Sequence, residues 1–307
     1  MAWLELLDKK IADYLPDVTV AQNEPLSRHC SFRIGGAARR MAFPKNGEQL
    51  ILLQAFAEEC GARTVLLGRG SNVLFPDEGL DALVISTEEM DEITAPEAGL
   101  YVARAGATLN RLALQACRDG YTGLEFAHGI PGSVGGGVCM NAGAYDGELS
   151  QVIEWVEVLF PDEGVRRIPC EEMAFGYRHS LLSDRKDAIV LSAAFRLIKG
   201  DSSEIRAKMD ELMARRKASQ PLEFPSAGST FKRPAGHFAG RLIQEAECKG
   251  LSVGGAQVSE KHAGFVINCG GATCADVRGL IADVQRRVYD RSGVMLEPEV
   301  RYQEHRQ

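Results

Sequence analysis

The sequence predicts an α+β fold, and three observations lead to this class. Strand-like runs at 152–160 and 188–198 follow one another with no helical pattern between them, which favours antiparallel pairing. Helical patterns occupy separate stretches, at 46–60, 108–119, 202–217 and 274–291. Strands and helices do not alternate regularly, as they would in a chain built from βαβ units.

The predicted helices depend on hydrophobic spacing and on signals at their ends. The predicted helix at 46–60 is followed by Gly61, and the predicted helix at 108–119 is followed by Gly120. Glycine commonly ends a helix, so each of these residues marks a helix end. The apolar residues that recur at helical spacing are Leu109, Leu112, Ala113 and Ala116, then Ile205, Met209, Leu212 and Met213, then Val277, Leu280, Ile281, Val284 and Val288. The amphipathic start of the chain, with Leu4, Leu7, Ile11 and Tyr14, predicts a helical segment within 1–30.

Short β-rich runs lie between these helices. They cover residues 64–68, 82–86, 101–106, 152–160, 188–198 and 264–268. The helix at 202–217 is followed by "ASQPLEFPSAGS", in which Pro221 and Pro225 interrupt regular structure. This segment is the best candidate for a domain boundary.

Composition limits the class of protein. Hydrophobic residues make up 45% and charged residues 25% of the 307 residues, as in an ordinary soluble protein of two or three domains. The net charge of −7 argues against a general nucleic-acid binder. Gly, Pro, Ser and Asn interrupt the long uncharged stretch from Phe126 to Tyr145, so we predict no membrane insertion. The N-terminus lacks the apolar core of a signal peptide, and we expect a cytoplasmic protein.

The cysteines and histidines predict no metal site. The eight cysteines, at 30, 60, 117, 139, 170, 248, 269 and 274, include no Cys-x-x-Cys pair and have no histidine at metal-ligand spacing. The six histidines are equally dispersed. Scattered buried thiols explain this pattern better than a metal or redox centre.

Two glycine-containing loops are the main functional signal. Residues 129–148, "GIPGSVGGGVCMNAGAYDGE", hold seven glycines, and "LLGRGSNVLFPDEG" at 66–79 follows a β-like run directly. The alternative interpretation of residues 129–148 is a flexible surface loop without a binding role. Neither loop matches a P-loop or the dinucleotide fingerprint. Successive backbone N–H groups form anion sites, so two such loops could hold a pyrophosphate with few charged side chains.

The ordered motifs along the chain resemble those of the UDP-N-acetylenolpyruvoylglucosamine reductase (MurB) family. The similar segments are "SFRIGGAARRMAFP", "GRGSNVLFPD", "GLEFAHGIPGSVGGGVCMNAGAYDGE", "FGYRHSLL", "PSAGSTFKRP", "AGRLIQEAECKGLSVGGAQVSEKHAGFVIN" and "LEPEVR", and they cover nearly the whole sequence. The chain resembles the shorter class of this family, because no room for an additional Tyr-bearing loop exists between Arg178 and Pro225.

The resemblance implies an FAD-binding fold of the vanillyl-alcohol-oxidase (PCMH) type in two subdomains, followed by an α+β substrate-binding domain. We expect an N-terminal helical segment at 1–30, the FAD-binding domain at 31–200, divided near 87–100, and the C-terminal domain at 201–307. FAD is expected to bind non-covalently, since neither loop offers a His or Cys at an attachment position. The candidate FAD-binding residues are Gly68, Gly70, Ser71, Asn72, Gly132, Ser133, Asn141 and Gly143.

The family's reaction implies three catalytic residues. NADPH would reduce the flavin, hydride would pass from flavin N5 to C3 of the enolpyruvyl group, and a proton would reach C2. Arg178 in "FGYRHS" matches the residue that grips the substrate carboxylate, and Ser229 in "SAGSTF" matches the proton donor. Glu299 in "LEPEVR" takes the third role, and the match to Glu-Val selects it over Glu297.

Substrate binding is expected to involve further residues, at positions that match the family or in basic clusters. They are Tyr145, Tyr177, Lys232, Lys249 and His262. Two departures from the family pattern, Arg233 and the pair Glu247-Cys248, lie outside the catalytic trio. Two alternatives stay open: another PCMH-type flavin oxidase, and a catalytically silent nucleotide-sugar binder.

Overall fold

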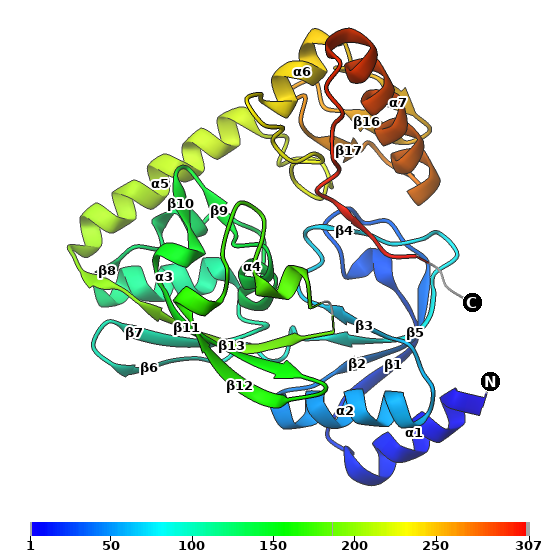
Figure 1. Cartoon of the computed structure of the whole chain (residues 1–307), viewed down its shortest axis with the longest axis vertical. Coiled ribbons are helices and arrows are strands. Elements are labelled where there is room, and N and C mark those ends of the chain that lie inside the picture. Colours follow the sequence, from blue (N-terminus) through cyan, green and yellow to red (C-terminus); the bar gives the residue numbers. More distant parts are fainter. Residues whose placement is uncertain (1, 186, 305–307) are drawn as a thin grey trace. The chain divides into compact units, whose positions relative to one another are not determined.

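The computed structural model describes residues 2–185 and 187–304, and they form two compact units (Figure 1). The first unit comprises 1–21, 41–69 and 83–215, and the second comprises 22–40, 70–82 and 216–307. The units are discontinuous in sequence. Four of the five boundaries between them fall inside elements: β1 (Thr19–Pro25), β2 (Ala37–Phe43), β5 (Leu80–Ser86) and α5 (Ser202–Ser219). The continuous domain ranges 1–30, 31–200 and 201–307 stay a prediction.

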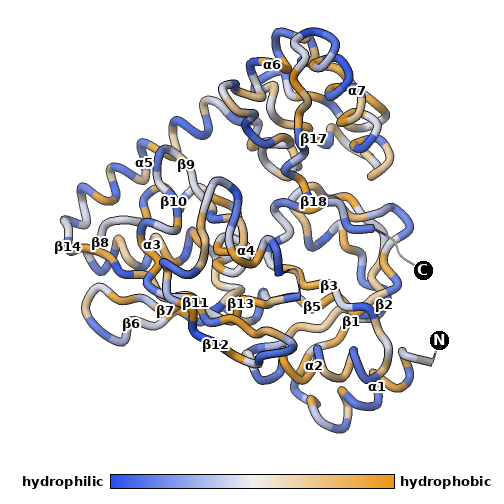
Figure 2. Tube along the Cα trace, in the orientation of Figure 1, coloured by the Kyte–Doolittle hydropathy of each residue, from blue (hydrophilic) through white to orange (hydrophobic). Residues whose placement is uncertain are grey.

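An antiparallel sheet of five strands is the centre of the first unit, and its order is β12-β11-β13-β7-β6. The strands are β6 (Ile93–Glu97), β7 (Leu100–Arg104), β11 (Ile153–Phe160), β12 (Gly164–Pro169) and β13 (Ile189–Arg196). β11 pairs with both β12 and β13, so the antiparallel pairing predicted for the 150–198 region is confirmed. Figure 2 shows hydrophobic residues along β13, seven of whose eight residues are buried.

Two helices pack on this sheet within one hydrophobic core: α3 (Leu109–Asp119) and α4 (Val134–Cys139). The hydroxyl of Thr108 accepts a hydrogen bond from the N–H of Arg111 and caps the start of α3. Gly120, with φ of 74°, ends it in the left-handed conformation that glycine adopts without strain. The buried face of α3 includes the four residues predicted from helical spacing.

A second core in the same unit contains α1 (Ala2–Tyr14) and α2 (Gly47–Glu59), which lie side by side (Figure 1). The rings of Tyr14 and Phe56 lie 5.7 Å apart. The side chain of Asn46 accepts the N–H of Gln49 and begins α2. β3 (Thr64–Leu67) pairs in parallel with β5, in a four-stranded sheet of order β1-β2-β5-β3.

The predicted helical segment at 1–30 requires a correction. α1 ends at Tyr14, two residues before Pro16, because proline disfavours helical geometry in the residue that precedes it. Thr19–Pro25 forms β1, which is followed by a single 3-10 turn at Leu26–Arg28. Only the first half of the segment is therefore helical.

Short elements complete the first unit. The strands are β8 (Tyr121–Thr122), β9 (Gly143–Ala144), β10 (Gly147–Glu148) and β14 (Ile198–Lys199). The 3-10 turns are Glu125–Ala127, Leu149–Gln151, Cys170–Glu172 and Leu181–Ser183. Along the described residues, no helix combines the length and apolar character that crossing a membrane requires.

The second unit contains two helices, a three-stranded sheet of order β15-β16-β17, and one parallel strand pair. Its elements are α6 (Ala239–Glu245), α7 (Cys274–Ser292), β15 (Ser252–Val253), β16 (Ala256–Val258), β17 (Val266–Asn268), β4 (Val73–Leu74) and β18 (Arg301–Tyr302). Thr273 caps α7, and the carboxylate of Asp77 also accepts the N–H groups of Cys274 and Ala275. These contacts fix the end of the glycine loop at 66–79 to the start of α7.

Candidate active site

The two glycine loops meet in the first unit, at Gly68 and Ser133. A Cβ atom built on Gly68 would lie 2.4 Å from the hydroxyl oxygen of Ser133, so only glycine fits there without displacing that side chain. Ser133 is buried, and its hydroxyl accepts the N–H of Gly136 at 3.3 Å to cap α4. The end of β3 and the start of α4 are thus in direct contact.

Backbone donors gather where these loops meet. The N–H groups of Gly68 and Arg69, and those of Gly132 and Ser133, donate to no residue in the described ranges 2–185 and 187–304. Ser133 is buried, and a buried N–H without an acceptor is costly unless a ligand supplies one. Consecutive N–H groups of this kind suit a diphosphate. These loops therefore fit the diphosphate of FAD, with Gly68, Gly132 and Ser133 as the residues that would hold it.

The close approach of Gly68 and Ser133 leads to a prediction about FAD affinity. We expect Gly68→Ala to weaken FAD binding about tenfold, because the new methyl group must displace the Ser133 hydroxyl and weaken a cap worth about 1 kcal/mol. The double variant Gly68→Ala/Ser133→Gly should recover most of the affinity, since glycine is a tolerated cap and removes the collision. Fluorescence titration of the apoprotein with FAD measures both. Equal weakening in the single and double variants would contradict this account.

Most glycines of the 129–148 loop are needed for packing within the protein, and the role of Gly143 as an FAD contact stays a prediction. Added Cβ atoms would lie 3.0 Å from the Cβ of Ala105 at Gly135, 2.9 Å from Leu149 at Gly137, and 2.5 Å from Phe126 at Gly147. At Gly143 the added atom would lie 2.6 Å from the carbonyl oxygen of Gly147, across the β9–β10 hairpin. Glycine is required here because backbone and core side chains approach closely.

Two predicted FAD-binding residues, Gly70 and Asn72, have contacts within the second unit. Gly70, with φ of 60°, lies against His29 and Cys30, where an added Cβ would be 2.1 Å from the carbonyl oxygen of His29. The side chain of Asn72 donates to the carbonyl of Glu299 at 3.1 Å. These two positions, together with Ser71, remain predictions as FAD contacts.

Asn141 is buried and holds two other segments of the first unit. Its carboxamide accepts the N–H of Ser150 at 3.0 Å and donates to the carbonyl of Gly176 at 3.2 Å. Gly176 lies two residues before Arg178. The side chain of Asn141 therefore fixes the segment that carries the predicted catalytic arginine, and its role as an FAD contact stays a prediction.

Arg178 lies in a tight turn of the first unit. Gly176 and His179 exchange backbone hydrogen bonds of 3.1 and 3.2 Å, which leaves Tyr177 and Arg178 at the tip. The φ of Arg178 is 54°, a left-handed conformation that costs a non-glycine residue about 1–2 kcal/mol. Residues strained in this way often lie at functional sites. The Arg178 guanidinium lies 5.6 Å from the ring of Tyr177.

The segments that carry Ser229 and Glu299 come together in the second unit. The N–H of Glu299 donates to the carbonyl of Thr230 at 2.8 Å, directly beside Ser229. Thr230 itself is buried, and it also bonds the carbonyl of Gly264 and the N–H of Val266. The segment with the predicted proton donor is thus fixed between two other segments. Within the described part of the chain, the Ser229 hydroxyl has no hydrogen-bond partner.

Glu297 and Glu299 have different surroundings. Glu297 is exposed and forms an ion pair with Lys232, whose N–H also donates to the carbonyl of Glu297 at 2.9 Å. Glu299 is half-buried. This difference supports the choice of Glu299 over Glu297, and the charge of Lys232 is partly neutralised before any substrate binds.

His262 is half-buried in the second unit and is set up as a neutral hydrogen-bond donor. Its Nδ1 accepts the N–H of Gly264 at 3.1 Å, which assigns the ring proton to Nε2. Burial lowers the pKa of His262, and the nearby charge of Lys249 lowers it further. At neutral pH this ring offers an N–H donor instead of a positive charge. Lys249 is exposed.

Tyr145 lies at the tip of the β9–β10 hairpin in the first unit. Tyr145 and Asp146 both have positive φ, as a two-residue hairpin turn of type I′ requires. The guanidinium of Arg215 lies 5.0 Å from the Tyr145 ring. The role of Tyr145 as a substrate contact remains a prediction.

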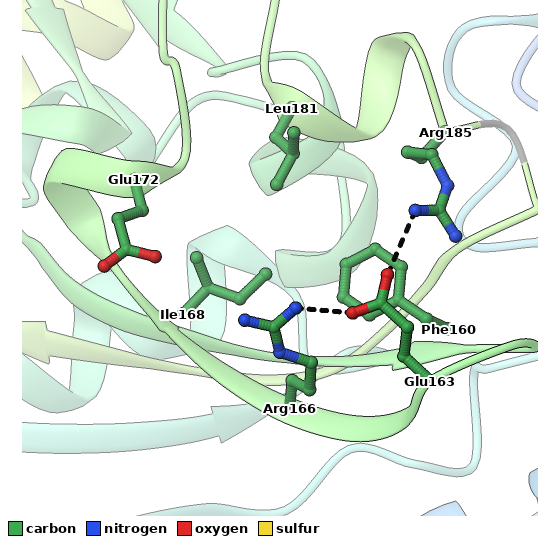
Figure 3. A pocket seen from close by; sticks show the side chains of 7 residues that line it. All are labelled: Phe160, Glu163, Arg166, Ile168, Glu172, Leu181 and Arg185. Carbon is green, nitrogen blue, oxygen red and sulfur yellow. Dashed lines mark hydrogen bonds and ion pairs between the residues drawn. The ribbon is translucent and has the colours of Figure 1, made fainter.

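A pocket of about 220 Å³ lies elsewhere in the first unit, at the β11–β12 hairpin (Figure 3). Glu163 bridges Arg166 and Arg185 there, and Arg185 lies 4.8 Å from the ring of Phe160. None of the predicted site residues lines this pocket. Its arginines are engaged in ion pairs, so we do not assign it to the substrate.

Sequence reasoning missed Thr230, and it selected Asn72 and Asn141 as FAD-binding residues without indicating what their side chains hold in place. Thr230 and the carboxamides of Asn72 and Asn141 form hydrogen bonds to segments distant in sequence. A buried threonine beside Ser229 carries no sequence signal of this role, because its partners are identified only by packing.

Comparison with known proteins agrees with these observations. Residues 38–168 match an FAD binding domain, and residues 220–303 match the C-terminal domain of UDP-N-acetylenolpyruvoylglucosamine reductase. The UDP-N-acetylenolpyruvoylglucosamine reductase of Pediococcus pentosaceus is 47% identical over 96% of this chain and 98% of its own. That of Caldanaerobacter subterraneus subsp. tengcongensis is 44% identical over 97% and 98%.

A solved structure gives the same result. The crystal structure of UDP-N-acetylenolpyruvylglucosamine reductase (MurB) from Thermus caldophilus has a TM-score of 0.78 and 35% identity, and the match covers 94% of this chain and 99% of that one. The fold and the loops define an FAD-containing oxidoreductase. The predicted α+β class, with an FAD-binding domain and a C-terminal domain, is confirmed. The chain belongs to the UDP-N-acetylenolpyruvoylglucosamine reductase family.

Proposed function

We propose that this protein reduces UDP-N-acetylglucosamine enolpyruvate to UDP-N-acetylmuramate with NADPH as the reductant, as a cytoplasmic step of peptidoglycan precursor synthesis. Relatives that match nearly the full length carry the name of this reductase, which supports the substrate. One observation carries the assignment: the backbone bond between Glu299 and Thr230 holds a carboxylate-bearing segment beside the available hydroxyl of Ser229.

The chemistry divides between cofactor and protein. When bound, FAD would supply the redox chemistry, as the carrier of hydride from NADPH through N5 to C3 of the enolpyruvyl group, and Gly68, Gly132 and Ser133 would hold its diphosphate. The chain's residues bind and orient the substrate, stabilise the charge that develops on its carboxylate, and protonate C2. Arg178 grips the carboxylate, because a planar guanidinium can donate two parallel hydrogen bonds.

Ser229 donates its proton to C2, and Glu299 polarises the developing enolate or organises the proton path. A hydroxyl suffices as the acid, because an enolate-like carbon is strongly basic. The hydroxyl has no competing partner in the described chain, which supports this role.

The remaining polar residues bind the nucleotide sugar. Lys249 supplies a positive charge, and the Nε2–H of His262 supplies a neutral donor close to it. Tyr145, Tyr177 and Lys232 are further contacts in this proposal. The charge of Lys232 would act after its exposed pair with Glu297 opens, at a cost of about 1 kcal/mol or less.

An anaerobic flavin experiment tests the function. Purified protein is reconstituted with FAD, reduced with NADPH, and then mixed with UDP-N-acetylglucosamine enolpyruvate. We expect the flavin absorbance to bleach and then to recover. Bleaching without recovery, together with rapid reaction with oxygen, would indicate a flavin oxidase instead. Protein that cannot be reconstituted with FAD would indicate a nucleotide-sugar binder without catalytic activity.

A further inference from the structure

We propose that Asn72 is a positioning residue that couples the glycine loop at 66–79 to Glu299. Its side-chain nitrogen donates to the carbonyl of Glu299 at 3.1 Å, and its backbone carbonyl accepts the N–H of Arg301 at 3.0 Å. Asn72 thus holds the chain on both sides of Val300. This inference rests on the proposed role of Glu299.

The contact continues into a regular strand pair. β4 and β18 pair in parallel, with Val73 opposite Arg301 and Leu74 opposite Tyr302. β4 begins at the residue after Asn72. The Asn72 side chain therefore lies at the end of this strand pair that is nearer in sequence to Gly68 and Gly70. The strand β18, which begins two residues after Glu299, is therefore held in register against β4 of the loop.

Both polar groups of the Glu299 backbone are fixed by different segments. Its N–H donates to Thr230, and its carbonyl accepts from Asn72. The first bond sets the distance to Ser229, and the second sets the rotation of the peptide plane that follows the Glu299 Cα atom. A shift of about 1 Å in a catalytic group can slow a reaction about 100-fold.

A second bridge links the same loop to the segment of Ser229. The hydroxyl of Ser31 donates to the carbonyl of Ser226 at 2.6 Å, and the N–H of Ser31 donates to the carbonyl of Gly70 at 3.0 Å. Gly70 and Asn72 therefore connect the loop to both catalytic segments. All of these residues belong to the second unit.

The test separates positioning from cofactor binding. We expect Asn72→Ala to slow substrate-dependent flavin reoxidation about 10- to 100-fold, with flavin reduction by NADPH changed less than about threefold. The FAD dissociation constant, measured by fluorescence titration, should also change by less than about threefold, because the carboxamide faces Glu299. In a Glu299→Gln background, Asn72→Ala should add less than about threefold, since its effect passes through Glu299.

Two further variants keep the test decisive. Asn72→Asp preserves the side-chain shape but removes the N–H donor, and we expect it to slow reoxidation as much as Asn72→Ala does. It tests the same hydrogen bond should Asn72→Ala fold poorly. Gln285→Ala is the matched control, because the Gln285 side chain donates to the carbonyl of Leu296 at 2.8 Å in the same segment. It should lower the melting temperature without slowing reoxidation.

The outcomes are distinguishable. Weaker FAD binding with unchanged reoxidation in the Asn72 variants would overturn the inference and make Asn72 a cofactor ligand. Equal slowing by Gln285→Ala, or full additivity with Glu299→Gln, would also overturn it. If Glu299→Gln itself leaves reoxidation unchanged, the proposed role of Glu299 fails instead.

Discussion

Ser229→Ala is expected to slow the reoxidation of reduced flavin by substrate about 10²- to 10⁴-fold, the usual contribution of a general acid. Flavin reduction by NADPH should be unchanged, because the proton is needed only in the second half-reaction. Stability should change little, since the hydroxyl bonds to no part of the described chain. Stopped-flow absorbance under anaerobic conditions measures each half-reaction separately.

The matched control for this variant is Ser252→Ala. Ser252 is an exposed serine of the same unit, whose hydroxyl donates to the carbonyl of Gly250 at 3.1 Å. Both half-reactions of the control should stay within about twofold of the parent enzyme. A Ser229→Ala variant that reoxidises within threefold of the parent would exclude Ser229 as the proton donor.

Arg178→Ala is expected to lower the rate of substrate-dependent reoxidation about 10²- to 10³-fold, the typical effect of removing a positioned donor from developing charge. Arg178→Lys should recover only part of this loss, because an ammonium group retains the charge but not the two parallel N–H groups. Substrate titration in the same stopped-flow assay separates the effects on binding and on rate. Full recovery in the lysine variant would show that charge alone suffices.

Arg178→Gly provides a matched comparison with Arg178→Ala. Both lose the guanidinium, but glycine relieves the left-handed backbone strain that alanine retains at φ of 54°. We expect the glycine variant to be more stable than the alanine variant by about 1 kcal/mol in urea denaturation, with equally low activity. If activity instead followed stability across the two variants, the arginine would be structural.

These predictions depend on residues that sequence reasoning selected and that the structure surrounds with unexpected contacts. The motif around Ser229 identified the hydroxyl, and the structure adds the buried Thr230 that fixes its segment. The glycine loops indicated a backbone anion site. Gly68 meets Ser133 there, whereas Gly135, Gly137 and Gly147 serve packing within the protein.

Local signals were reliable wherever a few neighbouring residues decide the backbone conformation. Gly120 ends α3 as predicted, and Gly61 follows α2 with a positive φ. The helical expectation for 1–30 was wrong after Tyr14, where the chain turns into β1. β1 became a strand by pairing within a sheet, which no short-range pattern reports.

The sequence by itself determined the α+β class, the main helices, the two backbone-rich loops and the residue types able to perform the chemistry. Each of these follows from side-chain size, spacing and dihedral preference within a few residues. The tertiary structure alone decided which groups hold one another. Asn72 bonds Glu299 across 227 positions of sequence, because hydrogen-bond partners so far apart are chosen by how the whole chain packs.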